Sequence, residues 1–410
     1  MGIGIRRAAV VLATAGLIVS ACSSAATPAP TQQPSPSPMA ASAAPSMAPS
    51  MAPSVAPSVA PSAAAASPVA GAPFTFALRD GSTFTLASSI ADKIKGKQPL
   101  NIYMSYQSVA EPGAPYLITA GLNEAAQEMQ QKYGVTINTK LIGTPETDPS
   151  AQISQIQQMV SAGQLDCVGV EPVTPDAFAS VLNSTIAAGV PVMTVNTDSP
   201  QSKRIAYYGA NDTDPTNALF TGNIAGQFTV DWAKKNNINL TKVALITGDT
   251  TAPWAQGRMQ GWLNAVKAAF PNVQVVGTPT NAFTTGYDPA QITPKMISFM
   301  NGHPDVQFYF SSDWEGAEIG QLIQKNGLKG KVFALGFNMD QTMLADLDAG
   351  TLIGTVDQRY DLQAKTFLEG CANLLLGGVV PDQWQYVTPT VWTPATAGAA
   401  RQLYQSLHAL

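Results

Sequence analysis

The sequence predicts an α/β protein with two lobes, each a doubly wound parallel sheet, joined by a multi-strand hinge around a central cleft. Short apolar runs alternate with stretches of helical spacing, in two successive series. The runs are apolar at consecutive positions, which is typical of parallel strands covered on both faces. The chain that follows residue 98 is long enough for two lobes of ordinary domain size.

The first 21 residues have the pattern of a signal peptide. Arg6 and Arg7 precede an apolar run, 8–19, that is too short to span a bilayer. The run leads into Val-Ser-Ala-Cys at 19–22, which resembles a bacterial lipobox. That resemblance implies cleavage before Cys22 and lipid attachment to its thiol, rather than a chance cysteine after a plain signal peptide. We therefore expect an anchor on the outer face of the cytoplasmic membrane, with the working domain extracellular or periplasmic.

Residues 22–73 have a composition that does not favour a packed core. They are almost entirely Ala, Pro, Ser, Thr and Met, and the tetrapeptides APSM and APSV repeat over 44–59. Such a segment buries too little apolar surface to offset its ordering entropy. It is expected to be a disordered tether that clears a surface layer, or a solubilising spacer.

The strands and helices of the two lobes follow in order. Residues 74–98 have no assigned role, and a small hairpin packed on the first lobe is one possibility. Strands of the first lobe are expected at 100–106, 135–142, 165–170 and 190–195, with helices at 116–132, 151–162 and 175–188. Strands of the second are expected at 242–248, 273–278, 306–312, 331–337 and 352–356. Its helices are expected near 217–235, 256–270, 289–301, 317–325 and 340–349.

A last helix over 362–376 ends at Gly377 and Gly378, with Pro381 beyond, which is a typical stop signal. The expected boundaries are 99–211 plus 358–385 for the N-terminal lobe, and 212–357 plus 386–410 for the C-terminal lobe.

Polar residues follow the strand at 190–195 without a spacer. Asn196, Thr197 and Asp198 come directly after Val195. In open α/β sheets, ligands bind beyond the carboxyl ends of the strands. These side chains are therefore expected to face the cleft between the lobes.

Composition argues against several functions. The sequence pI is about 5.1, the formal net charge is −5, and there is no basic block for nucleic acid. The two histidines, His303 and His408, form no arguable catalytic constellation, and 247–249 is not a phosphate loop, so no enzyme activity is expected. We expect no cofactor and no metal, because no Cys/His spacing for zinc is present. Cys167 and Cys371 are expected to be buried free thiols, and a disulfide between them is the alternative.

The chain resembles the type I periplasmic binding proteins of the ribose/galactose class, which are solute receptors for ABC importers. Six segments carry the resemblance over 99–391. They are GVPVMTVNTDSP, YYG followed by Asn211 and Asp212, GDTTAPWAQGRMQGW, HPDVQFYFSSD, VFALGFN and LIGTVDQ. The resemblance implies a ligand site made from strand-end residues of both lobes. A transcription regulator with the same lobes would need a DNA-binding head, whereas this chain is expected to have a signal peptide and a tether. The residues that we expect to bind ligand are Asn196, Asp198, Arg258, Trp254, Phe283, Asp313, Asn338, Gln358 and Glu171.

Alternatives accompany several of these residues. Phe283 could instead pack inward, and Glu171 with Pro172 could be only a solvated turn. Further aromatic candidates are Trp314 and one of Tyr106 and Tyr116. Asn211 and Asp212 are expected to be helix caps or hinge groups first.

The chain also departs from the pattern. Relatives that take simple pentoses and hexoses often carry aspartate at Asn196 and Asn338, and arginine at Thr197. The resemblance therefore does not single out ribose or glucose, and Asp198 is the expected source of the missing charge. The loop at 105–117 is longer than the family's first loop, so its contacts cannot be aligned.

The expected function is extracytoplasmic capture of a monosaccharide or related polyol by a monomer, with an ABC permease and its ATPase as partners. One alternative is a receptor for a nucleoside or a furanose signalling molecule. Another is a sugar receptor coupled to a membrane sensor, which would share every site residue and differ only in its partner.

Overall fold

The computed structural model describes residues 74–111, 113–212, 217 and 220–408. These residues belong to one compact unit, Ala63–Leu410. The expected signal peptide, the lipidated Cys22 and the tether lie outside the described residues. Among the described helices, none is long and apolar enough to cross a membrane.

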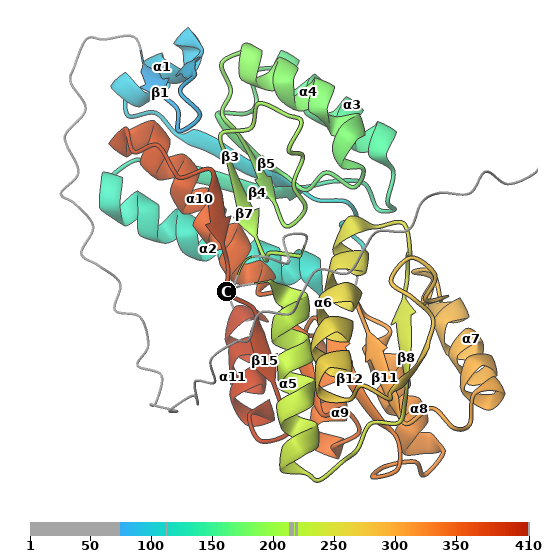
Figure 1. Cartoon of the computed structure of the whole chain (residues 1–410). Helices are drawn as coiled ribbons and strands as arrows, with labels where there is room; N and C mark the ends of the chain where they lie inside the picture. The colour runs from blue at the N-terminus through green and yellow to red at the C-terminus, as the bar shows by residue number, and fades with distance from the viewer. Residues whose placement is uncertain (1–73, 112, 213–216, 218–219, 409–410) are drawn as a thin grey trace, which may run out of the picture. The chain divides into compact units, whose positions relative to one another are not determined.

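The first sheet has six parallel strands in the order β14-β7-β6-β5-β3-β4. Their bounds are β3 (Leu100–Ser105), β4 (Ile137–Ile142), β5 (Cys167–Val170), β6 (Val192–Val195), β7 (Ala206–Gly209) and β14 (Trp384–Tyr386). Helices α2 (Ala114–Tyr133) and α10 (Tyr360–Gly377) pack together on one face, and α3 (Pro149–Ser161) and α4 (Pro175–Ala187) cover the other (Figure 1). We call this sheet and its four helices the first lobe.

The second sheet has seven strands in the order β10-β8-β11-β12-β13-β15, with β9 beside β8. Their bounds are β8 (Lys242–Thr247), β9 (Gln274–Val276), β10 (Phe283–Thr284), β11 (Phe308–Ser311), β12 (Phe333–Phe337), β13 (Gly354–Asp357) and β15 (Thr390–Trp392). β15 is antiparallel to β13, an edge that the sequence pattern did not predict, and the other pairs are parallel.

Five helices cover the second sheet, and we call the whole the second lobe. α5 (Thr221–Lys235) packs against α6 (Pro253–Ala269), and α7 (Pro289–Gly302), α8 (Gly316–Lys325) and α9 (Gln341–Ala349) follow one another in contact. In Figure 1, α5 and α6 lie to one side of β12 and β11, and α7 and α8 to the other. The final helix α11 (Ala397–His408) packs against both α2 and α9. The expected α/β fold with two mainly parallel sheets is confirmed.

Within the described residues, the chain passes between the sheets at three places. These are the connections from β7 to α5, from β13 to α10 and from β14 to β15. At the second connection Arg359 takes a left-handed conformation, with φ of 60°. Its guanidinium there pairs with Asp361 at 2.7 Å.

Residues 74–98 form a small hairpin and a helix on the first lobe. β1 (Thr75–Ala77) and β2 (Thr83–Thr85) pair antiparallel, and α1 (Ser88–Lys95) follows. Phe76 and Phe84 are buried in the first lobe's core. Lys93 Nζ contacts the buried Asp166 at 2.9 Å. The extension is therefore part of the first lobe's packing.

Cys167 and Cys371 form a disulfide, with their Cα atoms 6.2 Å apart. The preferred interpretation of these residues as free thiols was therefore wrong. Cys167 begins β5, and α10, which carries Cys371, packs directly over that strand. Both side chains are fully buried. The two cysteines are 204 residues apart in the sequence, and only the packing of α10 on β5 brings them together.

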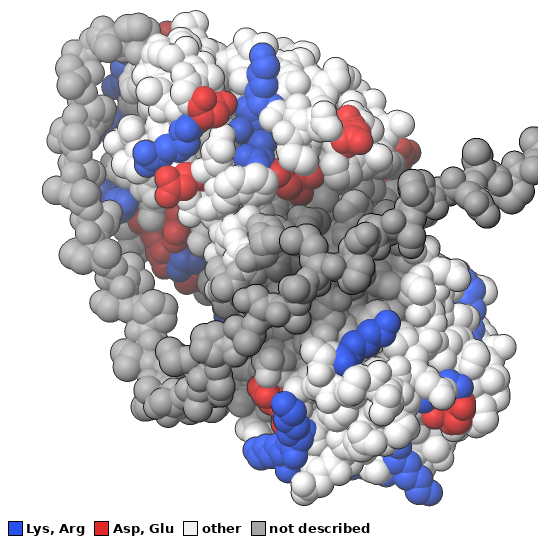
Figure 2. All heavy atoms as spheres, in the orientation of Figure 1, with Lys and Arg blue, Asp and Glu red and all other residues white. Residues whose placement is uncertain are grey.

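Charged side chains are interspersed on the face of the protein shown in Figure 2. Lysines and arginines do not gather there into a single patch, and acidic side chains lie between them.

Candidate functional site

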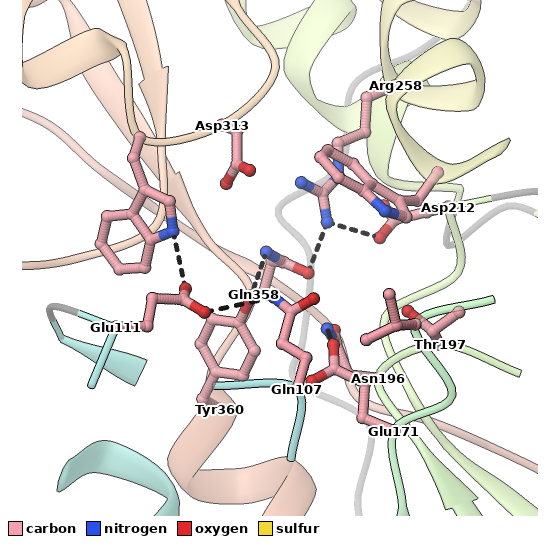
Figure 3. Close-up of a pocket in the computed structure, with 13 residues that line it drawn as sticks. Gln107, Glu111, Glu171, Asn196, Thr197, Asp212, Arg258, Asp313, Gln358 and Tyr360 are labelled. Atoms are coloured by element: carbon pink, nitrogen blue, oxygen red, sulfur yellow. Dashed lines mark hydrogen bonds and ion pairs between the residues drawn. The ribbon is translucent and has the colours of Figure 1, made fainter. Parts of the chain in front are cut away.

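A polar pocket lies where the carboxyl ends of strands from both sheets meet (Figure 3). It encloses about 440 Å³ of space, part of which is open to solvent. Its lining includes one aliphatic residue, and the rest are polar, charged or aromatic. The lining residues are Gln107, Glu111, Glu171, Val173, Asn196, Thr197, Asp212, Trp254, Arg258, Asp313, Trp314, Gln358 and Tyr360.

Asn196 and Glu171 form the first lobe's side of the pocket. Each follows a buried strand, β6 and β5 respectively. Asn196 adopts φ of 62°, a left-handed conformation that asparagine tolerates better than most residues. Its backbone N–H continues the ladder to the Tyr208 carbonyl, while its side-chain Nδ2 donates to Glu171 Oε1 at 2.5 Å. The turn after β6 therefore aims the amide into the pocket.

Arg258 is the centre of the second lobe's side. It lies on α6 with 2% of its surface exposed. One terminal nitrogen donates to Asp212 Oδ2 at 2.7 Å and to Gln358 Oε1 at 2.5 Å, and the other to the Ser312 carbonyl at 2.9 Å. The ring of Trp254 covers the guanidinium at 4.6 Å. Burial lowers the pKa of Arg258, but the charge and hydrogen bond of Asp212 and the charge of Asp313 together outweigh burial, so the pKa rises above its ordinary value.

Asp313 and Gln358 are held in place by Asn338. The Asn338 Nδ2 donates to Asp313 Oδ1 at 2.6 Å, and Gln358 Nε2 donates to Asn338 Oδ1 at 2.5 Å. Asn338 follows β12 with φ of 71°, the same left-handed turn as Asn196 in the other lobe. It is fully buried and is not among the lining residues. Its role is therefore to orient the two side chains that do line the pocket.

Glu111 and Trp314 meet from opposite lobes. Glu111 Oε1 accepts from the Trp314 indole at 3.0 Å, and Oε2 accepts from the Tyr106 hydroxyl at 2.8 Å and from Gln107 at 3.1 Å. Trp314 also packs against Gly113, where an added Cβ would lie 2.8 Å from the ring. Gly113 has φ of 88°, so glycine is required there for both reasons.

Burial raises the pKa of three carboxyls in the pocket. It raises the pKa of Glu111 to about 7, with a further rise from the charge of Asp313. It raises the pKa of Glu171 to about 8, and Glu111 adds to this against the lowering by Asn196 and the Gln107 backbone amide. For Asp313, burial raises the pKa to about 6 although the charge of Arg258 lowers it. Perturbed groups of this kind concentrate at functional sites.

The structure brings together most of the residues that the sequence singled out. Asn196, Glu171, Trp254, Arg258, Asp313 and Gln358 all line one pocket, and Asn338 supports two of them. Trp314 also lines it, whereas neither candidate tyrosine does. Tyr106 is buried beneath Glu111, and Tyr116 packs edge-on against Tyr404.

Asp198 and Phe283 do not line the pocket, and each contacts another partner instead. Asp198 lies two residues past the Asn196 turn, where its carboxylate pairs with Arg204 at 2.5 and 2.7 Å. Phe283 lies in the edge strand β10, and its ring stacks on Phe299 of α7 at 4.2 Å. It belongs to the packing of the second lobe.

Several lining residues escaped the sequence analysis as ligand contacts. Gln107 and Glu111 lie in the long loop after β3, and Tyr360 is the first residue of α10. Asp212 was expected to be a hinge residue or helix cap. Thr197 was considered only as a position where the chain differs from the family's arginine. A carboxylate in a loop that follows a buried strand was the available signal for Glu111.

Two open α/β lobes with a polar pocket built from strand ends of both define a bilobed ligand-binding protein. The chain belongs to the periplasmic binding protein family, because the family model described as "Periplasmic binding protein domain" matches residues 110–378. The expected family is therefore confirmed. It is a family of binding proteins rather than of enzymes.

Among curated proteins, the chain is similar to "Ribose import binding protein RbsB" of Bacillus subtilis (strain 168). The two are 26% identical over 270 residues, which covers 66% of this chain and 81% of the relative. It is also similar to "Xylose/arabinose-binding protein XylF" of Sulfolobus acidocaldarius, with 22% identity over 55% of this chain and 56% of that relative's length.

Solved structures share the fold. A glucose-galactose binding protein from Geobacillus stearothermophilus, GanP, matches with a TM-score of 0.59 and 21% identity, over 72% of this chain and 98% of that one. A solute-binding protein from Burkholderia graminis in complex with D-arabinose matches with a TM-score of 0.60 and 22% identity, over 72% and 96%.

Proposed function

We propose that this protein is an extracytoplasmic solute-binding protein of an ABC importer and that it binds a monosaccharide or related polyol between its lobes. The observation that carries the proposal is the convergence of polar side chains from both lobes on one pocket. Asn196 and Glu171 come from the first lobe, and Arg258 and Asp313 from the second.

The hydrogen-bonding groups of the pocket suit a polyhydroxylated ligand. Sugar hydroxyls both donate and accept, and the pocket offers carboxylates, side-chain amides and a guanidinium. Glu171 Oε2, Asn196 Oδ1 and Arg258 Nε are inaccessible and make no hydrogen bond of normal geometry with the described residues. Hydrogen bonds to charged groups contribute about 1.5–3 kcal/mol each. Trp254 and Trp314 supply aromatic surface for the apolar C–H faces of a sugar ring.

The relatives support the same class of ligand. The Bacillus subtilis protein is named for ribose import, and the Sulfolobus acidocaldarius protein for xylose and arabinose binding. A solved structure from Actinobacillus succinogenes with the same fold holds bound D-allose. Ribose, xylose, arabinose and allose are all neutral monosaccharides, so a monosaccharide is the first class to test.

The proposed mechanism is closure of the lobes around the ligand. We take the lobes as 99–211 plus 358–385, and 212–357 plus 386–410. This division is supported by chain crossings next to Asp212 and Gln358, which both contact Arg258. A ligand that touches both lobes binds the closed form more tightly and shifts the population toward it.

Lipid attachment at Cys22 is part of the proposal. The family is extracytoplasmic, and the lipobox-like residues 19–22 follow an apolar run of signal-peptide length. A Cys22→Ser variant is expected to leave the membrane fraction of expressing cells. If the variant stays in that fraction as the parent does, the lipid anchor is ruled out.

The central experiment is a thermal-shift screen of the purified protein with pentoses, hexoses and polyols, followed by calorimetry. At least one compound is expected to raise the melting temperature and to bind with one-to-one stoichiometry. Small-angle scattering with that compound is expected to show a smaller radius of gyration. Absence of binding throughout the screen would falsify the monosaccharide proposal, and binding without compaction would remove the closure step.

A further inference from the structure

The pocket contains more acidic side chains than basic ones. Four carboxylates line it, Glu111, Glu171, Asp212 and Asp313, against the single cation Arg258. The four lie around one space in Figure 3, unlike the interspersed charges on the outer face in Figure 2. If all are ionised, three negative charges remain without a counterion in the lining.

Arg258 does not neutralise the three other carboxylates by direct contact. Its closest carboxylate is Asp212, at 2.7 Å, and its remaining hydrogen bonds go to Gln358 and to a backbone carbonyl. The side-chain partners of Glu111 are Tyr106, Gln107 and Trp314, all neutral. Those of Glu171 and Asp313 are the amides Asn196 and Asn338.

The three carboxylates also interact with one another. The charge of Asp313 raises the pKa of Glu111, and the charges of Glu111 and Asp313 raise that of Glu171, in addition to the effect of burial. Burying carboxylates together without a cation is unfavourable, because each loses hydration and repels the others. A ligand with a positive charge would reduce both the cost of lost hydration and the repulsion between the carboxylates.

A second, independent observation is that several acceptors of the lining have no hydrogen-bond partner among the described residues. Glu171 is 3% exposed and lines the pocket, and its Oε2 makes no hydrogen bond of normal geometry with the residues that the structure describes. Asp212 Oδ1 and Asn196 Oδ1 are inaccessible acceptors of the same kind. The orphaned atoms of the lining are thus three acceptors and one donor, Arg258 Nε.

We propose that the ligand is a polyol that carries a protonated amino group, the class of amino sugars and imino sugars. An ammonium group is donor-only, which matches the excess of acceptors, and its charge offsets the unpaired carboxylates. The indole of Trp314 and the ring of Tyr360 add faces that attract a cation. The remaining hydroxyls would bind Arg258 and the amides as in the proposed function, on which this inference rests. A uronate or a sugar phosphate would meet repulsion.

The test is calorimetry on the purified protein with matched sets of sugars. Each set contains a neutral hexose, its 2-amino-2-deoxy form, the N-acetylated form and the uronate, in the gluco, galacto and manno series. Deoxynojirimycin is included as an imino sugar. At least one amino or imino compound is expected to bind tenfold or more tighter than its neutral and N-acetylated counterparts, with the uronates weakest.

A charge-removing variant then assigns the effect to the pocket. Glu171→Gln keeps the shape and the bond with Asn196 but removes one negative charge. It is expected to weaken binding of the amino compound at least tenfold more than it weakens binding of the neutral sugar. Glu146→Gln, which changes net charge equally at an exposed position, is the control and is expected to leave both affinities unchanged.

The possible outcomes distinguish a failure of this inference from a failure of the proposed sugar-binding function. If a neutral sugar binds as tightly as every amino form, or if Glu171→Gln weakens both equally, the charged-ligand inference is overturned and the sugar-binding function stands. If no compound of any set binds, both are overturned.

Discussion

The Trp314 indole of the second lobe donates a hydrogen bond to the Glu111 carboxylate of the first, at 3.0 Å, across 203 residues of sequence. The Trp314 ring also packs against Gly113, which follows Glu111 closely in the sequence. One side chain thus both lines the pocket and joins the lobes, and its removal gives the first prediction.

Trp314→Phe is expected to weaken ligand binding about three- to tenfold. The ring is largely kept, but the closed form loses a bond to a buried carboxylate and leaves Glu111 Oε1 without its donor. Calorimetry gives the affinity and scattering gives the compaction. Trp392→Phe is the control, because it loses an equivalent bond to Asp357, at 2.9 Å, within one sheet. It should lower stability and leave affinity within twofold; an equal loss of affinity in both variants would contradict a role in closure.

Arg258→Ala is expected to weaken binding tenfold or more, which is about 1.4 kcal/mol or above. It also leaves Asp212 buried without its counterion, so the free energy of unfolding should fall by about 3–5 kcal/mol. Denaturant unfolding measures the second effect. Adding Asp212→Asn should restore part of the stability and none of the affinity. Unchanged affinity in Arg258→Ala would remove this residue from the site.

The stability of the ligand-free protein is expected to fall as pH rises from about 4.5 to about 8. Burial raises the pKa of Glu171 to about 8 and of Glu111 to about 7, from the ordinary 4.5. Between these pH values the native form keeps protons that the unfolded chain has lost. The free energy of unfolding therefore falls as pH rises and levels off above pH 8. Melting temperatures between pH 5 and 9 measure this. Glu171→Gln should flatten the slope; a melting temperature that rises through this range would exclude the explanation.

Replacing both Cys167 and Cys371 by alanine is expected to lower the free energy of unfolding by about 2–4 kcal/mol. Ligand affinity should change less than threefold, because Cys167 lies at the start of β5 and the pocket residue Glu171 follows its end. Denaturant titration and calorimetry measure the two quantities, with the reduced parent protein as control. Equal stability of the parent with and without reductant would count against the bond.

Asp198→Asn and Phe283→Leu are expected to leave ligand affinity within about twofold, less than 0.5 kcal/mol. Asp198 binds Arg204, and Phe283 packs on Phe299. Both variants should instead lose stability in denaturant. A tenfold loss of affinity in either one would return that residue to the site.

The corrections show why the candidate site was only partly predictable. Asn196, Arg258, Asp313 and Gln358 were found because each follows a strand end or lies in a motif whose position is local to the sequence. Asp198 stands two residues from Asn196, yet the left-handed turn at Asn196 sends the two side chains to different partners. Glu111 was missed because its role depends on Trp314, a residue of the other lobe.

Hydrophobic periodicity in the sequence was enough to predict most of the strands and helices and the two lobes, because it is a property of neighbouring residues. Only the tertiary packing brings Cys167 to Cys371, places the antiparallel edge strand β15 beside β13 and gathers four carboxylates in the lining of one pocket. Those features depend on distances between segments far apart in the chain. Such distances are set by how helices pack on sheets and how one lobe meets the other.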